Sequence, residues 1–347
     1  MSRLRSLGPL YVTRLREFYR QPARIFWVYG FPTVMAVVLG LAFRSEPSKL
    51  VMVDFVANES SASVAETLKA NPNIKLKSED AALADRRLMT GKAALVVVPG
   101  VSGITYRYDN TRPEAVAARA SFDDALQRSA GRKDAIATED RLVTEYGSRY
   151  IDFLIPGLIG LNTMGGGLWG IGFLLVNFRV GKLLKRFMAT PMPRENFLLA
   201  VLLARMTFLL PDVGVLLGLG HWGFGMPIRG SLIALTLVLI VGALAFAGIG
   251  LLVASRAQST ETVSGLMNLV MLPMWLFSGV FFSSERFPDA IQPLIQALPL
   301  TQLIGALRMI LLEGAGLADR GVVVAVAVLA AWAVGTFAIA LRIFRWI

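Results

Sequence analysis

Long apolar stretches alternate with short polar segments along most of this 347-residue chain. A helix needs about 20 apolar residues with few charges to cross a hydrocarbon layer of about 30 Å. Such stretches occur at residues 25–43, 151–176, 197–219, 231–254, 263–282 and 321–341. The pattern predicts an α-helical polytopic membrane protein with six transmembrane helices, the first of which is far in sequence from the other five.

The segment between the first two apolar stretches, residues 44–150, has the composition of an ordinary soluble domain. Runs rich in β-branched residues and intervening helical periodicities predict three strands and two helices. The strands are expected at residues 51–56, 94–98 and 104–108, and the helices at 61–70 and 80–90. We expect an α/β domain outside the bilayer, followed by a five-helix core at 151–347.

The overall composition favours a membrane as the solvent of the chain. Hydrophobic residues make up 55% of the sequence and charged residues 17%, and the mean hydropathy is +0.59. That charge content is too low to solvate a compact soluble protein of this size. There is no cysteine, and His221 is the one histidine. The lack of cysteine excludes thiolate metal sites, and a single histidine leaves no imidazole cluster for a zinc centre, so we expect no catalytic residue, no metal site and no bound cofactor.

Basic residues follow an alternating pattern along the chain. If the N-terminus is cytoplasmic, the cytoplasmic flanks hold Arg3, Arg5, Arg14, Arg16, Arg20, Arg24, Arg179, Lys182, Lys185, Arg186, Arg194, Arg256, Arg342 and Arg345. The short loops on the other side hold Arg229, Arg286, Arg308 and Arg320. Because cytoplasmic loops are enriched in Lys and Arg, both termini are predicted to be cytoplasmic and the α/β domain extracytoplasmic. Nucleic-acid binding, which the net charge of +11 suggests, needs that charge on one soluble surface and is not expected.

Two cytoplasmic segments have amphipathic patterns. In residues 1–24, apolar residues recur three and four positions apart, which predicts a helix in the membrane interface; a plain basic flank is the alternative. No A-x-A cleavage site follows the first apolar stretch, so we expect that span to be retained. In the loop at 177–197, Leu183, Leu184, Phe187 and Met188 form the apolar face of a short basic helix. This loop is predicted to dock a cytoplasmic partner, with a purely topogenic signal as the alternative.

Arg205 and Asp212 lie inside the third apolar stretch, seven residues or two helical turns apart. Charged groups at that depth avoid lipid, so the pair is predicted to face a translocation path or subunit interface, or to join neighbouring spans. The run Met164-Gly-Gly-Gly, at residues 164–167, predicts close helix packing. Neither Gly91-Lys92 nor Gly181-Lys182 has the glycine five positions earlier that a phosphate-binding loop needs.

Several segments resemble one family of membrane proteins. YIDFLIPGLI, at residues 150–159, resembles the opening of the membrane core in type-2 ABC transporter permeases. LPMWLFSGVFF at 272–282, Phe287-Pro288 and LPLTQLIGALR at 298–308 resemble the fifth span and re-entrant outer hairpin of that family. The layout of an interfacial helix, one span, a large extracytoplasmic domain and five spans is similar to the subgroup of bacterial drug, lipid and peptide exporters.

The resemblance implies a permease subunit of an ATP-binding-cassette exporter in the bacterial inner membrane. Its implied partners are a separate ABC ATPase subunit that binds ATP and Mg²⁺, a second permease copy in a homodimer or related heterodimer, the lipid bilayer and a periplasmic adaptor. The ATPase-coupling residues carried over are Lys182, Leu183, Lys185, Arg186, Phe187, Thr190 and Pro191. The residues carried over for the outer hairpin at 283–320 are Pro299, Thr301 and Arg308. No substrate contact is carried over.

Other classes of protein remain open at this point. A sensor whose outer α/β domain binds a ligand would need a cytoplasmic output domain, and the inside segments are short. An ion-coupled transporter normally has acidic or histidine relays in several spans, whereas Asp212 stands nearly alone. An intramembrane hydrolase would need a Ser-His pair or paired aspartates within the spans.

Overall fold

The structure of the chain is a computed structural model. It describes residues 7–43, 51–56, 74–100, 103–132, 149–189 and 193–344. The chain divides into two compact units. A helical unit contains Met1–Arg44 and Val143–Ile347, and an α/β unit contains Ser45–Leu142. The two units are described separately.

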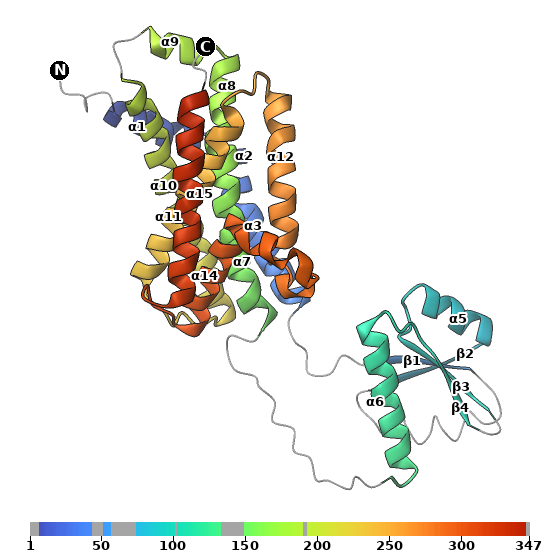
Figure 1. Cartoon of the computed structure of the whole chain (residues 1–347). Helices are drawn as coiled ribbons and strands as arrows, with labels where there is room; N and C mark the ends of the chain where they lie inside the picture. The colour runs from blue at the N-terminus through green and yellow to red at the C-terminus, as the bar shows by residue number, and fades with distance from the viewer. Residues whose placement is uncertain are drawn as a thin grey trace. The chain divides into compact units, whose positions relative to one another are not determined.

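The helical unit is a bundle of long helices with shorter ones at both ends (Figure 1). Its helices are α1 (Leu7–Tyr19), α2 (Pro22–Ile25), α3 (Phe31–Ala42), α7 (Tyr150–Gly167), α8 (Leu174–Val180), α9 (Leu183–Met188), α10 (Arg194–Gly218), α11 (Leu232–Ala254), α12 (Thr260–Phe277), α13 (Gln292–Ala297), α14 (Pro299–Arg308) and α15 (Arg320–Ile343). π-Helical turns at Phe26–Gly30 and Leu168–Phe173 join α2 to α3 and α7 to α8. Two more, Leu219–Gly223 and Met309–Glu313, extend α10 and α14.

Five continuous helices of the described chain are long and apolar enough to cross a membrane. They are Pro22–Ala42, Tyr150–Val180, Glu195–Gly223, Leu232–Ala254 and Arg320–Ile343. These match the stretches predicted at 25–43, 151–176, 197–219, 231–254 and 321–341. The chain is therefore mostly helical with multiple candidate spans, as the hydropathy pattern predicts.

The sixth predicted span, at 263–282, corresponds to a helix with different bounds in the structure. α12 covers Thr260–Phe277, and Gly279 then turns the chain in the left-handed conformation (φ 77°). α12 does not belong to the five helices named above. The pair Asp289–Ala297 and Pro299–Glu313 is apolar enough to count as one further span, but it is bent by 86°.

α11 is the central helix of the bundle, packed against both α7 and α15. Its apolar residues surround the whole helix, which is the pattern of a membrane-spanning helix in contact with both protein and lipid. Small residues let its neighbours come close. A Cβ atom added at Gly248 would lie 2.2 Å from the Thr336 hydroxyl of α15, and one at Gly250 would lie 2.7 Å from the Gly167 carbonyl oxygen of α7.

The end of α3 and the start of α7 lie side by side. The rings of Phe43 and Tyr150 are 4.5 Å apart, and a Cβ at Gly40 would lie 2.7 Å from the Ile151 side chain. The chain thus leaves the helical unit and returns to it at a single point. In Figure 1 this point is at the end of the bundle away from α9.

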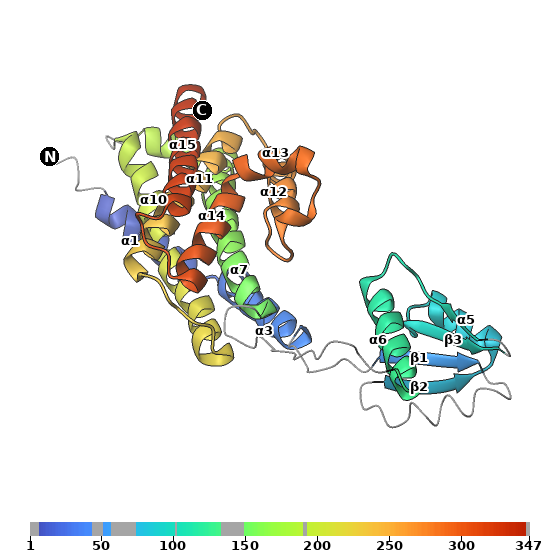
Figure 2. The ribbon, with the colours of Figure 1, turned by 60° about the horizontal axis from the view of Figure 1, so that its bottom comes forward.

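The α/β unit is a four-stranded sheet with a helix on each face (Figure 2). Its elements are β1 (Val51–Val56), β2 (Ile74–Glu79), α5 (Ala81–Met89), β3 (Leu95–Pro99), β4 (Ile104–Arg107) and α6 (Pro113–Ser129). The strand order is β2-β1-β3-β4, in which β1 pairs in parallel with β2 and β3, and β3 pairs antiparallel with β4.

Alternation along β1 explains how the two helices are placed. Val53 and Phe55 belong to the core formed with Phe122 of α6. Asp54, between them in sequence, points to the opposite face of the strand. There its carboxylate is buried and accepts a 2.6 Å hydrogen bond from the Arg87 guanidinium of α5. The ion pair fixes α5 on one face of the sheet while the apolar core holds α6 on the other.

The predicted strands at 51–56, 94–98 and 104–108 correspond to β1, β3 and β4, and the helix at 80–90 corresponds to α5. The helix predicted at 61–70 lies outside the described residues. The sequence did not predict β2, an edge strand that carries Lys75 and Lys77. It also did not predict α6, because two of the three residues that α6 buries are alanines, which give only a weak apolar stripe.

Candidate functional site

α9 lies across one end of the bundle, next to the C-terminus (Figure 1). Lys182 precedes it in the left-handed conformation (φ 57°), which reverses the chain after α8. Leu184 is 1% exposed, and the Phe187 ring packs against Phe178 and Phe197, at centroid distances of 6.4 and 5.2 Å. Much of the apolar face predicted to dock a partner is therefore covered by the chain itself.

The other side of α9 is a cationic surface. Its exposed basic residues are Lys182, Lys185 and Arg186. Leu183 is 36% exposed at the start of the helix. Thr190 and Pro191, which the sequence also assigns to this loop, lie outside the described residues. Contact of α9 with a partner stays a prediction, and the structure restricts the available contact surface on this helix mainly to its basic side.

Arg179 anchors the segment just before α9. Its Nη1 donates hydrogen bonds to the carbonyl oxygens of Ala254 (2.8 Å) and Ala257 (2.6 Å), and its Nη2 to that of Ser255 (3.2 Å). Ala254 ends α11, and Ser255 and Ala257 follow it, so these carbonyls lack the partner that a further helical turn would supply. The guanidinium also lies over the Phe344 ring, 5.1 Å from its centroid. The sequence marks Arg179 only as one of the basic residues of a cytoplasmic flank, and no sequence spacing indicates this capping role.

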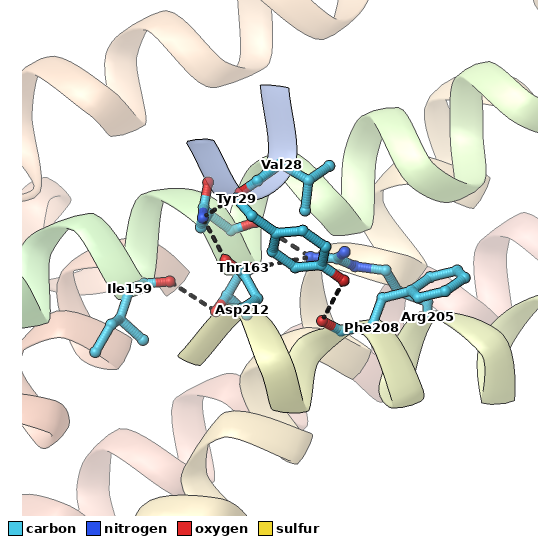
Figure 3. A network of polar contacts seen from close by, with 8 residues as sticks. Val28, Tyr29, Ile159, Thr163, Arg205, Phe208 and Asp212 are labelled. Carbon is cyan, nitrogen blue, oxygen red and sulfur yellow. Dashed lines mark hydrogen bonds and ion pairs between the residues drawn. The ribbon is translucent and has the colours of Figure 1, made fainter. Parts of the chain in front are cut away.

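A buried polar network joins α7 and α10 (Figure 3). Arg205 is 6% exposed and Asp212 is 2% exposed, and their Nη2 and Oδ2 atoms are 3.9 Å apart. The Asn162 side chain donates a 2.5 Å hydrogen bond to Asp212 Oδ1, and Arg205 donates a 3.3 Å bond to the Asn162 carbonyl. The two charges predicted to share a helix face do so, and Asn162 of α7 connects them.

The network extends to the first span. The Asn162 side chain also donates to the Val28 carbonyl at 3.1 Å, and the Tyr29 hydroxyl donates to the Phe208 carbonyl at 3.5 Å. In Figure 3 the Tyr29 ring lies beside the Arg205 guanidinium. Arg205 Nε and Asp212 Oδ2 have no hydrogen-bond partner among the described residues. The network therefore satisfies these two buried charged groups only in part, which is costly at this depth.

The glycine run of α7 makes room for this network. A Cβ atom added at Gly166 would lie 1.5 Å from Arg205 Nη2, so the guanidinium occupies the place of a side chain. At Gly167 a Cβ would meet the backbone of α11, as close packing predicts, whereas at Gly165 it would meet nothing within 4 Å. Arg205, Gly165 and Gly166 line a cavity of about 570 Å³ between α1–α2, the π-turn that follows them, α7–α8 and α10.

The cavity also reaches α1, where Arg14 and Glu17 form an ion pair at 2.6 Å. Burial lowers the pKa of Arg14, and the Glu17 carboxylate partly offsets this shift. α1 packs on α10 through Phe18, whose ring stacks on Phe208 at 4.0 Å, and through a 2.8 Å hydrogen bond between the Tyr11 and Thr207 hydroxyls. The amphipathic N-terminal helix predicted from the sequence thus covers one wall of the cavity.

The predicted outer hairpin is tied to the bundle through its polar residues. Pro299 begins α14 and is buried. The Thr301 hydroxyl donates a 3.0 Å bond to the Ser278 hydroxyl, just after α12. These contacts place Pro299 and Thr301 in the packing of the hairpin.

Arg308 joins three segments next to the predicted hairpin. Its Nη2 donates to the carbonyl oxygens of Phe153 (3.0 Å) and Gly279 (2.6 Å). The guanidinium carbon is also 3.5 Å from the centroid of the Phe153 ring. The residue therefore connects α14 to the start of α7 and to the turn after α12.

Comparisons with known proteins identify the family. The family model of ABC-2 family transporter proteins matches residues 23–342. The chain belongs to this family. Its resemblance to type-2 ABC permeases is thereby confirmed, and the ABC-2 chain is a multi-pass membrane protein by both family and helix composition.

Two curated proteins are similar to parts of the ABC-2 chain. ABC transporter G family member 20 of Dictyostelium discoideum is 32% identical over 194 residues, which cover 54% of this chain and 26% of that protein. Nodulation protein J of Rhizobium leguminosarum bv. viciae is 34% identical over 96 residues, which cover 28% of this chain and 34% of that protein. The matches thus span about a quarter and a third of these relatives.

The described part of the ABC-2 chain offers no cluster of three or more His, Cys, Asp or Glu side chains for a metal ion. Arg179 and Arg308 bind carbonyl oxygens, and Arg205 lies beside the single carboxylate of Asp212. Such groups hold segments together or bind anions, and they supply no nucleophile.

Proposed function

We propose that this chain is the permease subunit of an ATP-binding-cassette exporter and that a separate ATPase subunit, which binds ATP and Mg²⁺, drives it. Membership of the ABC-2 transporter family over residues 23–342 carries the proposal. The exposed basic side of α9 supports it, because a rigidly anchored cationic helix at one end of a bundle is suited to receive force from a partner. Arg179 supplies the anchor through its bonds to the end of α11.

The proposed topology places α9 and both termini on the cytoplasmic side of a bacterial inner membrane. The distribution of basic residues supports this orientation. The chain leaves and re-enters the bundle at the end away from α9, at Phe43 and Tyr150, which favours an extracytoplasmic α/β unit. We assign α12 as the fifth of six spans and the bent pair α13–α14, within residues 283–320, as a re-entrant hairpin. The ties of Arg308 and Thr301 to the bundle support a hairpin that returns to the side it enters from.

Two copies of the chain are proposed to form the translocation pathway together. α3 and α12 each have a wide apolar surface exposed on the single chain. The exposed apolar residues are Phe31, Val34, Val38 and Leu41 on α3 and Leu266, Leu269, Leu272, Trp275 and Leu276 on α12. A second copy would cover part of this surface, and nucleotide-driven closure of the ATPases would shift the population between pathway conformations.

Charge reversal on α9 tests the coupling role. In a complex of the tagged chain with its co-expressed candidate ATPase subunit, reconstituted in nanodiscs, Lys185→Glu/Arg186→Glu is expected to lower co-purification of the ATPase about tenfold. The reason is that two attractive contacts become repulsive. Co-purification and ATP hydrolysis are measured on the same samples, and both are expected to change.

The matched control is Arg342→Glu, which reverses an exposed charge in the last turn of α15, at the same end of the bundle. This variant is expected to retain both the ATPase subunit and its hydrolysis rate. If no ATPase associates with the wild-type chain, or if the α9 variant behaves like the control, the proposed coupling is wrong.

A further inference from the structure

The cavity between α1–α2, α7–α8 and α10 contains more positive than negative charge. Three guanidinium groups and one carboxylate line it, from Arg14, Arg24, Arg205 and Glu17. Glu17 is engaged by Arg14 at 2.6 Å. For Arg24, no acidic side chain of the described chain lies within ion-pair distance. The cavity therefore has cationic groups that its own carboxylate does not neutralise.

Arg205 is the most deeply buried of these cations. The residue is 6% exposed, and its Nε has no hydrogen-bond partner within the described segments. The Asp212 carboxylate lies 3.9 Å from Nη2, beyond hydrogen-bond distance, and does not line the cavity. A buried guanidinium has five donors in a planar fork and strongly favours an anion that it can bind through several of them. Arg205 thus supplies an incompletely used anion-binding group at the cavity wall.

The remaining walls are mainly apolar. Trp27, Trp169 and Phe173 contribute aromatic faces, and Gly165 and Gly170 leave the backbone of the second span open. Trp27 is also 62% exposed on the outside of the first span, so the cavity extends to the surface that faces the bilayer or a second copy. A volume of about 570 Å³ is in the range of small-molecule sites, which combine apolar walls with a few placed polar groups.

We propose that this cavity binds an amphiphile with one anionic headgroup, held by the Arg205 guanidinium, and that such amphiphiles are the cargo of the exporter. The apolar part of the ligand packs on Trp27 and Trp169 and extends toward the bilayer. The assignment of the ligand as cargo rests on the proposed transport function, whereas binding itself does not. The headgroup chemistry is shared by anionic membrane lipids and by free fatty carboxylates.

Tryptophan fluorescence tests the proposal on the full-length chain in nanodiscs, without an ATPase. Replacing Trp222, Trp275, Trp332 and Trp346 with Phe leaves Trp27 and Trp169 as the reporters at the cavity. One arm compares brominated phosphatidylglycerol with brominated phosphatidylcholine as the quenching lipid. The other arm adds dibromostearate or its methyl ester to unbrominated phosphatidylcholine nanodiscs.

In at least one arm, the anionic compound is expected to reach half-maximal quenching at about a tenfold lower concentration than its neutral counterpart. The reason is that hydrogen bonds between charged groups favour the anionic ligand over the neutral one by that factor or more. A preference in the lipid arm identifies a membrane lipid as the ligand source, and a preference only in the other arm identifies a free amphiphile. Equal quenching by anionic and neutral compounds in both arms would overturn the proposal.

Variants show whether Arg205 causes the preference. Arg205→Gln/Asp212→Asn removes both charges together, so no unpaired carboxylate stays buried, and it is expected to abolish the preference. Gly166→Ala keeps both charges but displaces the guanidinium, and is expected to reduce the preference severalfold. Arg229→Gln, at an exposed arginine outside the cavity, is the matched control and should leave the preference unchanged.

An unchanged anion preference in both folded Arg205 network variants would overturn the assignment of Arg205. Because no ATPase takes part in this measurement, it can succeed where the coupling experiment on α9 fails, and it can fail where that experiment succeeds. The two proposals are therefore tested independently.

Discussion

Gly167→Val is expected to destabilise the protein more than any other single change in the glycine run of α7. A Cβ atom at this position would lie 2.5 Å from Cβ of Phe246 and 2.7 Å from its carbonyl carbon. One contact is with the first side-chain atom of Phe246 and the other is with its main chain. Neither atom can move without moving α11, so the two helices would have to separate. Overpacking of this kind costs about 3 kcal/mol, which corresponds to roughly 10 °C in the midpoint of thermal unfolding. The measurement is the fraction of monodisperse protein left after heating in detergent.

Gly165→Val provides the matched control for this prediction. The substitution has the same chemistry two residues earlier in the same helix, and nothing lies within 4 Å of the added Cβ. The thermal midpoint is expected to stay within a few degrees of the wild-type value. If the two valine variants lost stability equally, the loss would come from the helix itself and not from close contact between α7 and α11.

The sequence predicted that the glycine run allows close packing, but not which glycine faces which neighbour. Gly167 contacts α11, Gly166 accommodates Arg205, and Gly165 faces open space. These three environments depend on how α7 is rotated relative to α10 and α11. Hydropathy does not contain that information, because all three positions lie in one apolar stretch.

The candidate site shows a similar limit. The seven-residue spacing of Arg205 and Asp212 correctly placed both side chains on one face of a helix, since that spacing is two helical turns. Asn162, which joins them, lies in another span and has no local pattern that indicates a partner. Likewise, the amphipathic pattern of α9 predicted an apolar face correctly. The side chains of Phe178 and Phe197 cover this face, and they lie next to it only in the folded chain.

The long helices were predictable because each stretch of about 20 apolar residues has one stable solution in a membrane. The path of the chain after α12 was harder to predict, because it depends on the turn at Gly279 and on polar contacts between distant segments. The resemblance to ABC-2 permeases indicated a hairpin there. It did not indicate that Arg308 holds the hairpin through the carbonyl oxygens of Phe153 and Gly279.

Arg308→Met is the second change expected to have a large effect. The variant keeps much of the aliphatic volume but leaves the carbonyl oxygens of Phe153 and Gly279 without their donor and removes the guanidinium from the Phe153 ring. Unpaired buried acceptors cost about 1–3 kcal/mol each, so a loss of roughly 10 °C in the thermal midpoint is expected. The same heating assay measures it, and Arg286→Met, at an exposed arginine of the same outer stretch, should have little effect.

Loosening of the hairpin can be separated from general loss of stability by thiol labelling. The chain has no cysteine, so Ser278→Cys introduces one thiol at a position that is 2% exposed and contacts Thr301. If Arg308 holds α14 against α7 and the turn at Gly279, then Arg308→Met should raise the rate of maleimide labelling at this thiol about tenfold or more below the unfolding temperature, because local opening governs access to buried groups. Arg308→Lys, which keeps a donor but lacks the planar fork, should give an intermediate rate. Equal labelling rates in the Arg308→Met and Arg286→Met backgrounds would mean that other contacts are sufficient to hold the hairpin.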